Sequence, residues 1–181
     1  MVCGPGKSAY NVLCGSFVRL VIAMLYLLVL TLHNLNRWLV LLCGLWATWQ
    51  VLRAWIGNQP WSPRTATVLR GFIALLDLQL LLGLVLYLLP GGLIQAVLHT
   101  IPWPQLIKDR LLRFFALEHP LQMLIAIALA HAALVTARRA KNERRRLAWT
   151  ALLLTLAMVL ILSAIPWPVF YYGRPWLRLA W

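Results

Sequence analysis

Acidic side chains are scarce in this sequence. Its 181 residues include four Asp and Glu against 17 Lys and Arg, and charged residues make up 12% of the chain. A soluble domain carries roughly 25% charged residues, whereas 62% of this chain is hydrophobic. The composition therefore excludes an ordinary soluble domain and indicates an integral membrane protein.

The net charge of +13 would favour nucleic-acid binding in a soluble protein. Here, however, the basic residues cluster between long apolar segments, where they set membrane topology and contact anionic lipid headgroups. We therefore expect the lipid bilayer, and not nucleic acid, to be the main partner.

Cysteine is also rare, and its spacing indicates no metal site. Cys3, Cys14 and Cys43 form no CxxC or CxxCH motif, so neither a structural zinc site nor covalent c-type haem attachment is indicated. The chain has no HExxH, P-loop, GxGxxG or nucleophile-elbow motif. These absences argue against hydrolase, protease, kinase and dehydrogenase chemistry of the soluble type.

Long apolar segments are what the sequence has instead. Four of them approach the ~20 residues needed to cross a bilayer, at residues 36–55, 66–89, 114–136 and 147–165. They predict an all-α integral membrane protein, with a single four-helix transmembrane domain over residues 31–181. Shorter helices at the membrane interface are predicted at residues 93–99 and 107–115.

Residues 1–30 form an N-terminal extension with three open interpretations. The apolar run 17–33 is long enough for a signal-type segment or for an extra N-terminal apolar helix. Alternatively, translation starts at Met24, and the preceding residues are not part of the protein.

The basic loop at residues 137–146 sets the predicted topology. It contains six Lys and Arg in ten residues, so the positive-inside rule makes it cytoplasmic. The segment 90–113 and the C-terminus then lie outside.

Polar residues near the outer ends of the first and third spans form one predicted cluster. His33 and Arg37 are four residues apart and share a helical face, and Glu118 and His119 lie at the same depth. His33 and His119 are either axial ligands of a b-type haem or interfacial residues that hydrogen-bond to backbone or lipid. Glu118 orients an imidazole, accepts protons or pairs with Arg37.

Two further polar sites lie deeper in the predicted bundle. Asp77 and Gln79 fall near mid-membrane, where a carboxyl group costs at least ~2.5 kcal/mol and needs a partner. Two interpretations of Asp77 are open. In the functional one, it is a proton relay or an ion site. In the structural one, it is a neutral, hydrogen-bonded acid that fixes helix packing, or it pairs with Arg70. His131 lies ~18 Å further in than His119 at 1.5 Å per residue, and we expect it to form an interhelical hydrogen bond.

Five motifs together resemble a family of small bacterial membrane proteins that are often labelled cytochrome b-like. They are LHNLNRWLVL at 32–41, DLQLLLGLVLY at 77–87, RFFALEHPLQML at 113–124, AIPWP at 164–168 and GRPWLR at 173–178.

This resemblance implies a multi-pass protein of the bacterial cytoplasmic membrane with haem b as cofactor. The family's His-containing and Glu-His motifs correspond to His33, Arg37, Glu118 and His119. Some members have His where this chain has Asp77, so ligation of haem from the second span is in doubt here.

Three functions are therefore expected as alternatives. The first is electron transfer through haem b held by His33 and His119, with Arg37 and Glu118 beside it. The second is a non-redox accessory subunit of a larger membrane complex, such as a respiratory complex. The third is a proton-coupled transporter that uses Asp77, Glu118 and His131. None of these is a stand-alone enzyme.

Overall fold

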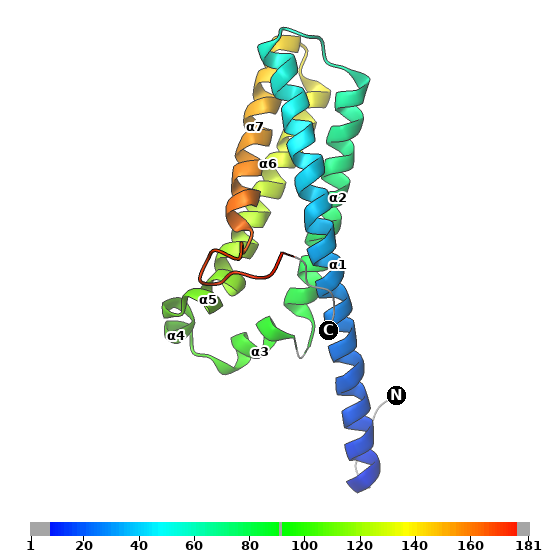
Figure 1. Cartoon of the computed structure of the whole chain (residues 1–181), viewed down its shortest axis with the longest axis vertical. Helices are drawn as coiled ribbons and strands as arrows, with labels where there is room; N and C mark the ends of the chain where they lie inside the picture. The colour runs from blue at the N-terminus through cyan, green and yellow to red at the C-terminus, as the bar shows by residue number, and fades with distance from the viewer. Residues whose placement is uncertain (1–7, 91, 177–181) are drawn as a thin grey trace.

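The computed structural model describes residues 8–90 and 92–176, and side chains from Gly15 onward. The described residues contain helices and no strand, and four long helices run alongside one another (Figure 1). These are α1 (Ser8–Ile56), α2 (Pro63–Leu88), α6 (His119–Arg139) and α7 (Glu143–Ala164). Each lies in a helical stretch long and apolar enough to cross a membrane. The expected all-helical fold with four apolar helices is confirmed, while the membrane and the side of each loop stay predictions.

Helix α1 is longer than the sequence predicted. It has 49 residues, or about 74 Å at 1.5 Å per residue, and its first part extends past the other helices (Figure 1). The run 17–33 is therefore continuous with the span predicted at 36–55 and does not form a separate helix. Asn36, where the predicted span began, lies inside the helix, and its amide donates to Leu75 O of α2 at 2.9 Å. That bond removes the competition with the helix backbone that usually makes Asn a poor helix former.

The helices pack as two closely associated pairs. Helix α2 packs mainly on α1, and α6 mainly on α7, while contact between α1 and α7 joins the pairs. Gly44 permits the close approach of three helices, since a Cβ there would lie 2.5 Å from Met158 Sδ and 2.7 Å from Phe72 Cε2. On α6, buried small residues face the core: Ala126, Ala130, Ala133 and Ala137. Small side chains of this kind let helices approach closely in lipid.

Short helices cover one end of the bundle, which we call the histidine end because His33 and His119 lie there. They are α3 (Leu93–Thr100), α4 (Trp103–Lys108), α5 (Arg110–Arg113) and the π-helical turn η1 (Phe114–Glu118). The helix predicted at 93–99 matches α3, but the one predicted at 107–115 is divided. Asp109 divides it, because its carboxylate accepts from Leu111 N and Leu112 N, both at 2.9 Å, and so starts a new helix.

The C-terminal segment 165–176 crosses back over the histidine end (Figure 1). Trp176 O accepts hydrogen bonds from Arg37 Nη2 at 2.9 Å and from Trp38 Nε1 at 3.1 Å. Tyr172 stacks on Phe114 with ring centroids 3.8 Å apart. These contacts attach the segment to both α1 and η1, so it closes the bundle at this end.

Candidate functional site

His33 of α1 and His119 of α6 face each other at the histidine end. Their ring centroids are 6.5 Å apart, and the ring planes are inclined by 68°. Both side chains line a cavity of ≈ 500 Å³ that lies among α1, α2, η1, α6, α7 and the C-terminal segment. A cavity of this size is within the range of small-molecule and cofactor sites.

The backbone just before His119 has an unusual conformation. Residues Phe114–Glu118 form a π-helical turn, a feature that is frequent at functional sites. The next residue after His119 is Pro120, which has no N–H to donate to the carbonyl of Ala116 one turn earlier. Instead, the hydroxyl of Tyr87 on α2 donates to Ala116 O at 3.0 Å. The segment that precedes His119 is therefore anchored to α2.

The ring of His119 is oriented by α7. Its Nδ1 lies 2.8 Å from Ala164 O, and because a carbonyl oxygen only accepts, Nδ1 is the donor. In neutral imidazole the other nitrogen, Nε2, then has a free lone pair. This arrangement is typical of metal-binding histidines, whose second nitrogen commonly donates to a backbone carbonyl.

His33 lies beside a glycine and a buried amide network. A Cβ on Gly83 of α2 would be 3.4 Å from His33 Cε1, so glycine leaves room for the imidazole. His33 Nδ1 is buried without a hydrogen-bond partner. The backbone carbonyl of His33 accepts from Gln79 Nε2 at 3.0 Å, and Gln79 Oε1 accepts from Asn36 Nδ2 at 2.8 Å. Gln79 was predicted as a buried polar residue, and its side chain links α2 to α1 by hydrogen bonds next to His33.

Two arginines make the cavity electropositive. Arg37 and Arg174 both line it, and no acidic side chain is among the described residues that do so. Arg37 donates to Trp176 O through Nη2, while its Nε is buried without a partner. The guanidinium of Arg174 lies 4.8 Å from the ring centroid of Phe115. No local sequence pattern predicts this position of Arg174, because only the return of the C-terminal segment brings it to the cavity.

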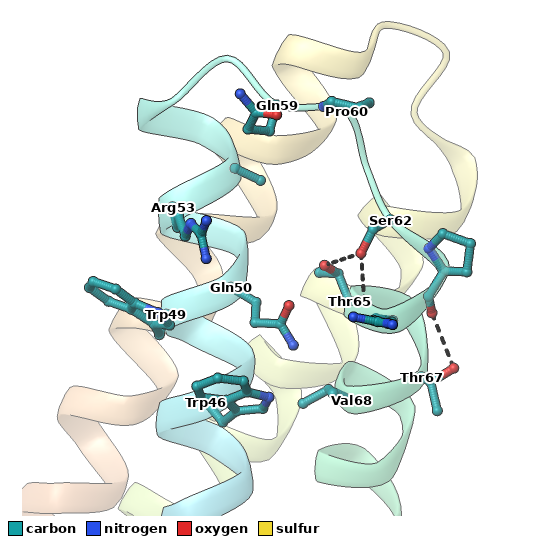
Figure 2. Close-up of a pocket in the computed structure, with 13 residues that line it drawn as sticks. Trp46, Trp49, Gln50, Arg53, Gln59, Pro60, Ser62, Thr65, Thr67 and Val68 are labelled. Atoms are coloured by element: carbon teal, nitrogen blue, oxygen red, sulfur yellow. Dashed lines mark hydrogen bonds between the residues drawn. The ribbon is translucent and has the colours of Figure 1, made fainter.

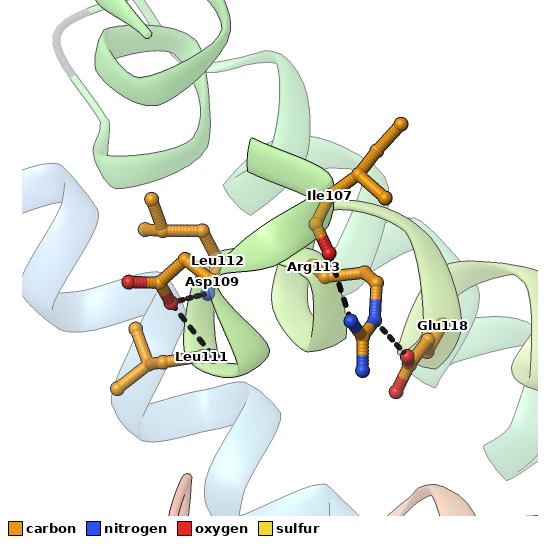
Figure 3. A network of polar contacts seen from close by, with 6 residues as sticks. All are labelled: Ile107, Asp109, Leu111, Leu112, Arg113 and Glu118. Atoms are coloured by element: carbon orange, nitrogen blue, oxygen red, sulfur yellow. Dashed lines mark hydrogen bonds and ion pairs between the residues drawn. The ribbon is translucent and has the colours of Figure 1, made fainter. Parts of the chain in front are cut away.

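Glu118 lies outside the cavity lining. Its Oε1 accepts from Arg113 Nε at 2.6 Å, and Arg113 also donates to Ile107 O at 2.8 Å (Figure 3). The expected neighbours were Arg37 and His119, but Glu118 pairs with Arg113, and Ala164 orients His119 instead. Of the predicted cluster, the structure therefore brings His33, Arg37 and His119 together around one cavity.

Asp77 and His131 form a separate polar pair between α2 and α6. His131 Nε2 lies 2.8 Å from Asp77 Oδ1, and each side chain is about half exposed, at 45% for His131 and 46% for Asp77. The alternative partner, Arg70, donates to Thr67 Oγ1 at 3.3 Å. Neither Asp77 nor His131 lines the cavity. The structure thus joins two residues of the expected relay and places Glu118 elsewhere.

The fold and the cavity define an all-helical protein with four apolar helices long enough to span a membrane and a histidine-lined cavity at one end. The chain matches no family model, no curated protein and no solved structure. The resemblance to cytochrome b-like membrane proteins therefore stays a prediction from the five motifs.

Proposed function

We propose that this protein binds haem b between His33 and His119 and transfers electrons within the membrane. The observation that carries this proposal is the pair of imidazoles that face each other across one cavity, with ring centroids 6.5 Å apart. Imidazole nitrogens bind transition metals at about 2 Å, so the centres of two rings on opposite sides of one metal ion lie roughly 6 Å apart. The observed separation fits this requirement.

The set of possible ligands favours haem over a bare metal ion. Among the described residues, no group of three or more His, Cys, Asp or Glu side chains is arranged to hold a metal. A zinc site needs at least three such protein ligands. Haem supplies its own four equatorial nitrogens and needs only axial ligands from the protein. Two facing histidines therefore suit haem.

The remaining lining suits an amphipathic macrocycle with acidic groups. The cavity wall is mainly apolar and includes Leu80, Leu84, Met123, Leu124 and Ile127. Such side chains exclude water and cover a flat apolar ring.

The cationic side chains complete the fit. Arg37 and Arg174 are available for the two propionate groups, because guanidinium groups bind carboxylates through paired charge-assisted hydrogen bonds. When bound, haem b supplies one-electron chemistry through its ferric and ferrous states. His119, oriented by Ala164, and His33 would be the residues that hold the haem iron.

A spectrum of the purified protein tests haem binding. Protein solubilised in mild detergent should show a Soret band that shifts on reduction with dithionite, and apoprotein should take up added haemin. A colourless protein that also fails to bind haemin would contradict the proposal. Electron transfer is tested separately in membrane vesicles: the bound haem should be reduced by a respiratory substrate and reoxidised by oxygen. Haem that responds to neither would contradict the electron-transfer part alone.

A further inference from the structure

A second cavity lies at the opposite end of the bundle, which we call the basic end because it carries Arg53, Arg64 and the 137–146 loop. This cavity has a volume of ≈ 810 Å³ and lies between the last turns of α1 and the first turns of α2. Figure 2 shows Gln50 of α1 extending toward Thr65 of α2, with Arg53 on the next turn of α1. Arg64 lines the same cavity from α2.

The two arginines in this cavity, Arg53 and Arg64, have no acidic partner among the described residues. Each of the four acidic side chains has another partner: Asp77 bonds to His131, Asp109 to the α5 backbone and Glu118 to Arg113, while Glu143, near the rim of the cavity, accepts from Trp61 N. At the N-terminus of α2, Pro63 has no N–H and Ser62 Oγ accepts from Thr65 N at 3.1 Å, so the positive potential here comes mainly from the two arginines. The cavity therefore favours an anionic group.

An apolar strip leads away from this cavity along α1. Leu39, Leu42, Trp46 and Trp49 are spaced three or four residues apart, so they lie on one helical face with Arg53 at its end. Their side chains are 52%, 66%, 56% and 57% exposed. Tryptophan is enriched where a membrane surface meets water. The strip from Leu39 to Arg53 covers about 21 Å at 1.5 Å per residue, which is sufficient for a long stretch of acyl chain.

We propose that the cavity at the basic end binds an anionic phospholipid. Arg53 and Arg64 bind the phosphate of the headgroup, and one acyl chain lies along Leu42 and Leu39 beneath the two tryptophans. A guanidinium fork suits phosphate oxygens, and basic pockets at helix ends are recognised sites for anionic lipid headgroups. A free phosphate ion would use the arginines but would leave the apolar strip without a function.

Native mass spectrometry of the detergent-solubilised chain tests this site. The protein is titrated with phosphatidylglycerol, with phosphatidylcholine, or with phosphatidylglycerol in the presence of inorganic phosphate. We expect phosphatidylglycerol to bind more tightly than phosphatidylcholine and to resist competition by millimolar phosphate. Replacing Arg53→Gln and Arg64→Gln should weaken phosphatidylglycerol binding at least about fivefold for each arginine removed.

Arg138→Gln with Arg139→Gln is the matched control, because it removes two charges from the same end on an exposed part of α6. It should leave the lipid affinity within about twofold, since charges beyond the site act only through screened potential. Equal losses in both double variants, no preference for phosphatidylglycerol, or full competition by inorganic phosphate would overturn the proposal. If the double variant at Arg53 and Arg64 does not fold, each single variant applies the same test, with a loss of about fivefold.

Discussion

His33 and His119 face each other with ring centroids 6.5 Å apart, although they belong to the first and third long helices of the chain. Each imidazole depends on a contact from another helix. Ala164 of α7 accepts from His119 Nδ1, and Gly83 of α2 leaves the space that His33 occupies. All four long helices therefore contribute to the arrangement of the two rings.

Replacing Arg174→Gln should speed the loss of haem from the protein. If Arg174 binds a propionate group, its removal costs one charge-assisted interaction, and haem transfer to apomyoglobin should accelerate about tenfold. Arg110→Gln is the control, because this exposed arginine lies at the same end of the bundle and does not line the cavity. Equal transfer rates for the Arg174 variant and the unmodified protein would remove Arg174 from the site.

A larger side chain at position 83 should block the cavity without unfolding the protein. A Cβ there already lies 3.4 Å from His33 Cε1, so Gly83→Leu must fill space beside the imidazole. We expect haemin affinity to fall about 5- to 150-fold, as overpacking typically costs about 1–3 kcal/mol. Circular dichroism should show unchanged helix content.

Gly71→Leu is the matched control on the same helix, because a Cβ at Gly71 meets no atom within 4 Å. It should leave haemin affinity unchanged. If the two leucine variants bind haemin equally well, the cavity beside His33 is not the haem site.

Tyr87→Phe should destabilise the protein, because the carbonyl of Ala116 loses the hydrogen bond that the Tyr87 hydroxyl donates. Ala116 is buried, and Pro120 has no N–H to replace the lost hydroxyl, so we expect a loss of about 1 kcal/mol in the free energy of unfolding. The measurement is thermal unfolding in detergent. In a Pro120→Ala background, Tyr87→Phe should cost less free energy of unfolding, because alanine at position 120 provides a backbone N–H that can donate to Ala116 O. Equal costs in both backgrounds would contradict this assignment.

The Asp77–His131 pair should contribute to the folding stability of the protein and should not affect the absorption spectrum of bound haem. A double-mutant cycle with Asp77→Leu and His131→Leu should give a coupling energy of about 0.6 kcal/mol and at most about 1.7 kcal/mol, the average and the maximum found for hydrogen bonds between membrane helices. Both single variants should keep the haem spectrum, since neither residue lines the cavity. A changed Soret band in either variant would connect this pair to the site.

Apolar length predicted the helices well because crossing a bilayer requires a minimum run of apolar residues. The predicted segments 66–89 and 147–165 match α2 and α7 closely at their C-terminal ends. The predicted span began at Asn36, whereas α1 begins at Ser8 and continues through Asn34 and Asn36. The amide of Asn36 donates hydrogen bonds to α2, and a local sequence pattern does not predict a partner that lies in another helix.

Residue counting also predicted that His33 and His119 lie at one level of the bundle, but it did not give the hydrogen-bond partners of the polar residues. His33 and His119 were expected at one level, and they meet there. Glu118 was expected to orient an imidazole, accept protons or pair with Arg37, whereas its carboxylate pairs with Arg113, just before the π-helical turn. Depth along a helix follows from sequence, but rotation about the helix axis depends on packing. Arg174 could not be placed at all, because it lies in an irregular segment that folds back over the bundle.

Electron paramagnetic resonance of the oxidised, haem-loaded protein tests the central claim most directly. Two axial imidazoles should give a low-spin ferric signal in the unmodified chain. His119→Ala and His33→Ala should each lose that signal in favour of high-spin iron or lose the haem, while His131→Ala should keep it. A low-spin signal that survives both His33→Ala and His119→Ala would contradict haem ligation by this pair.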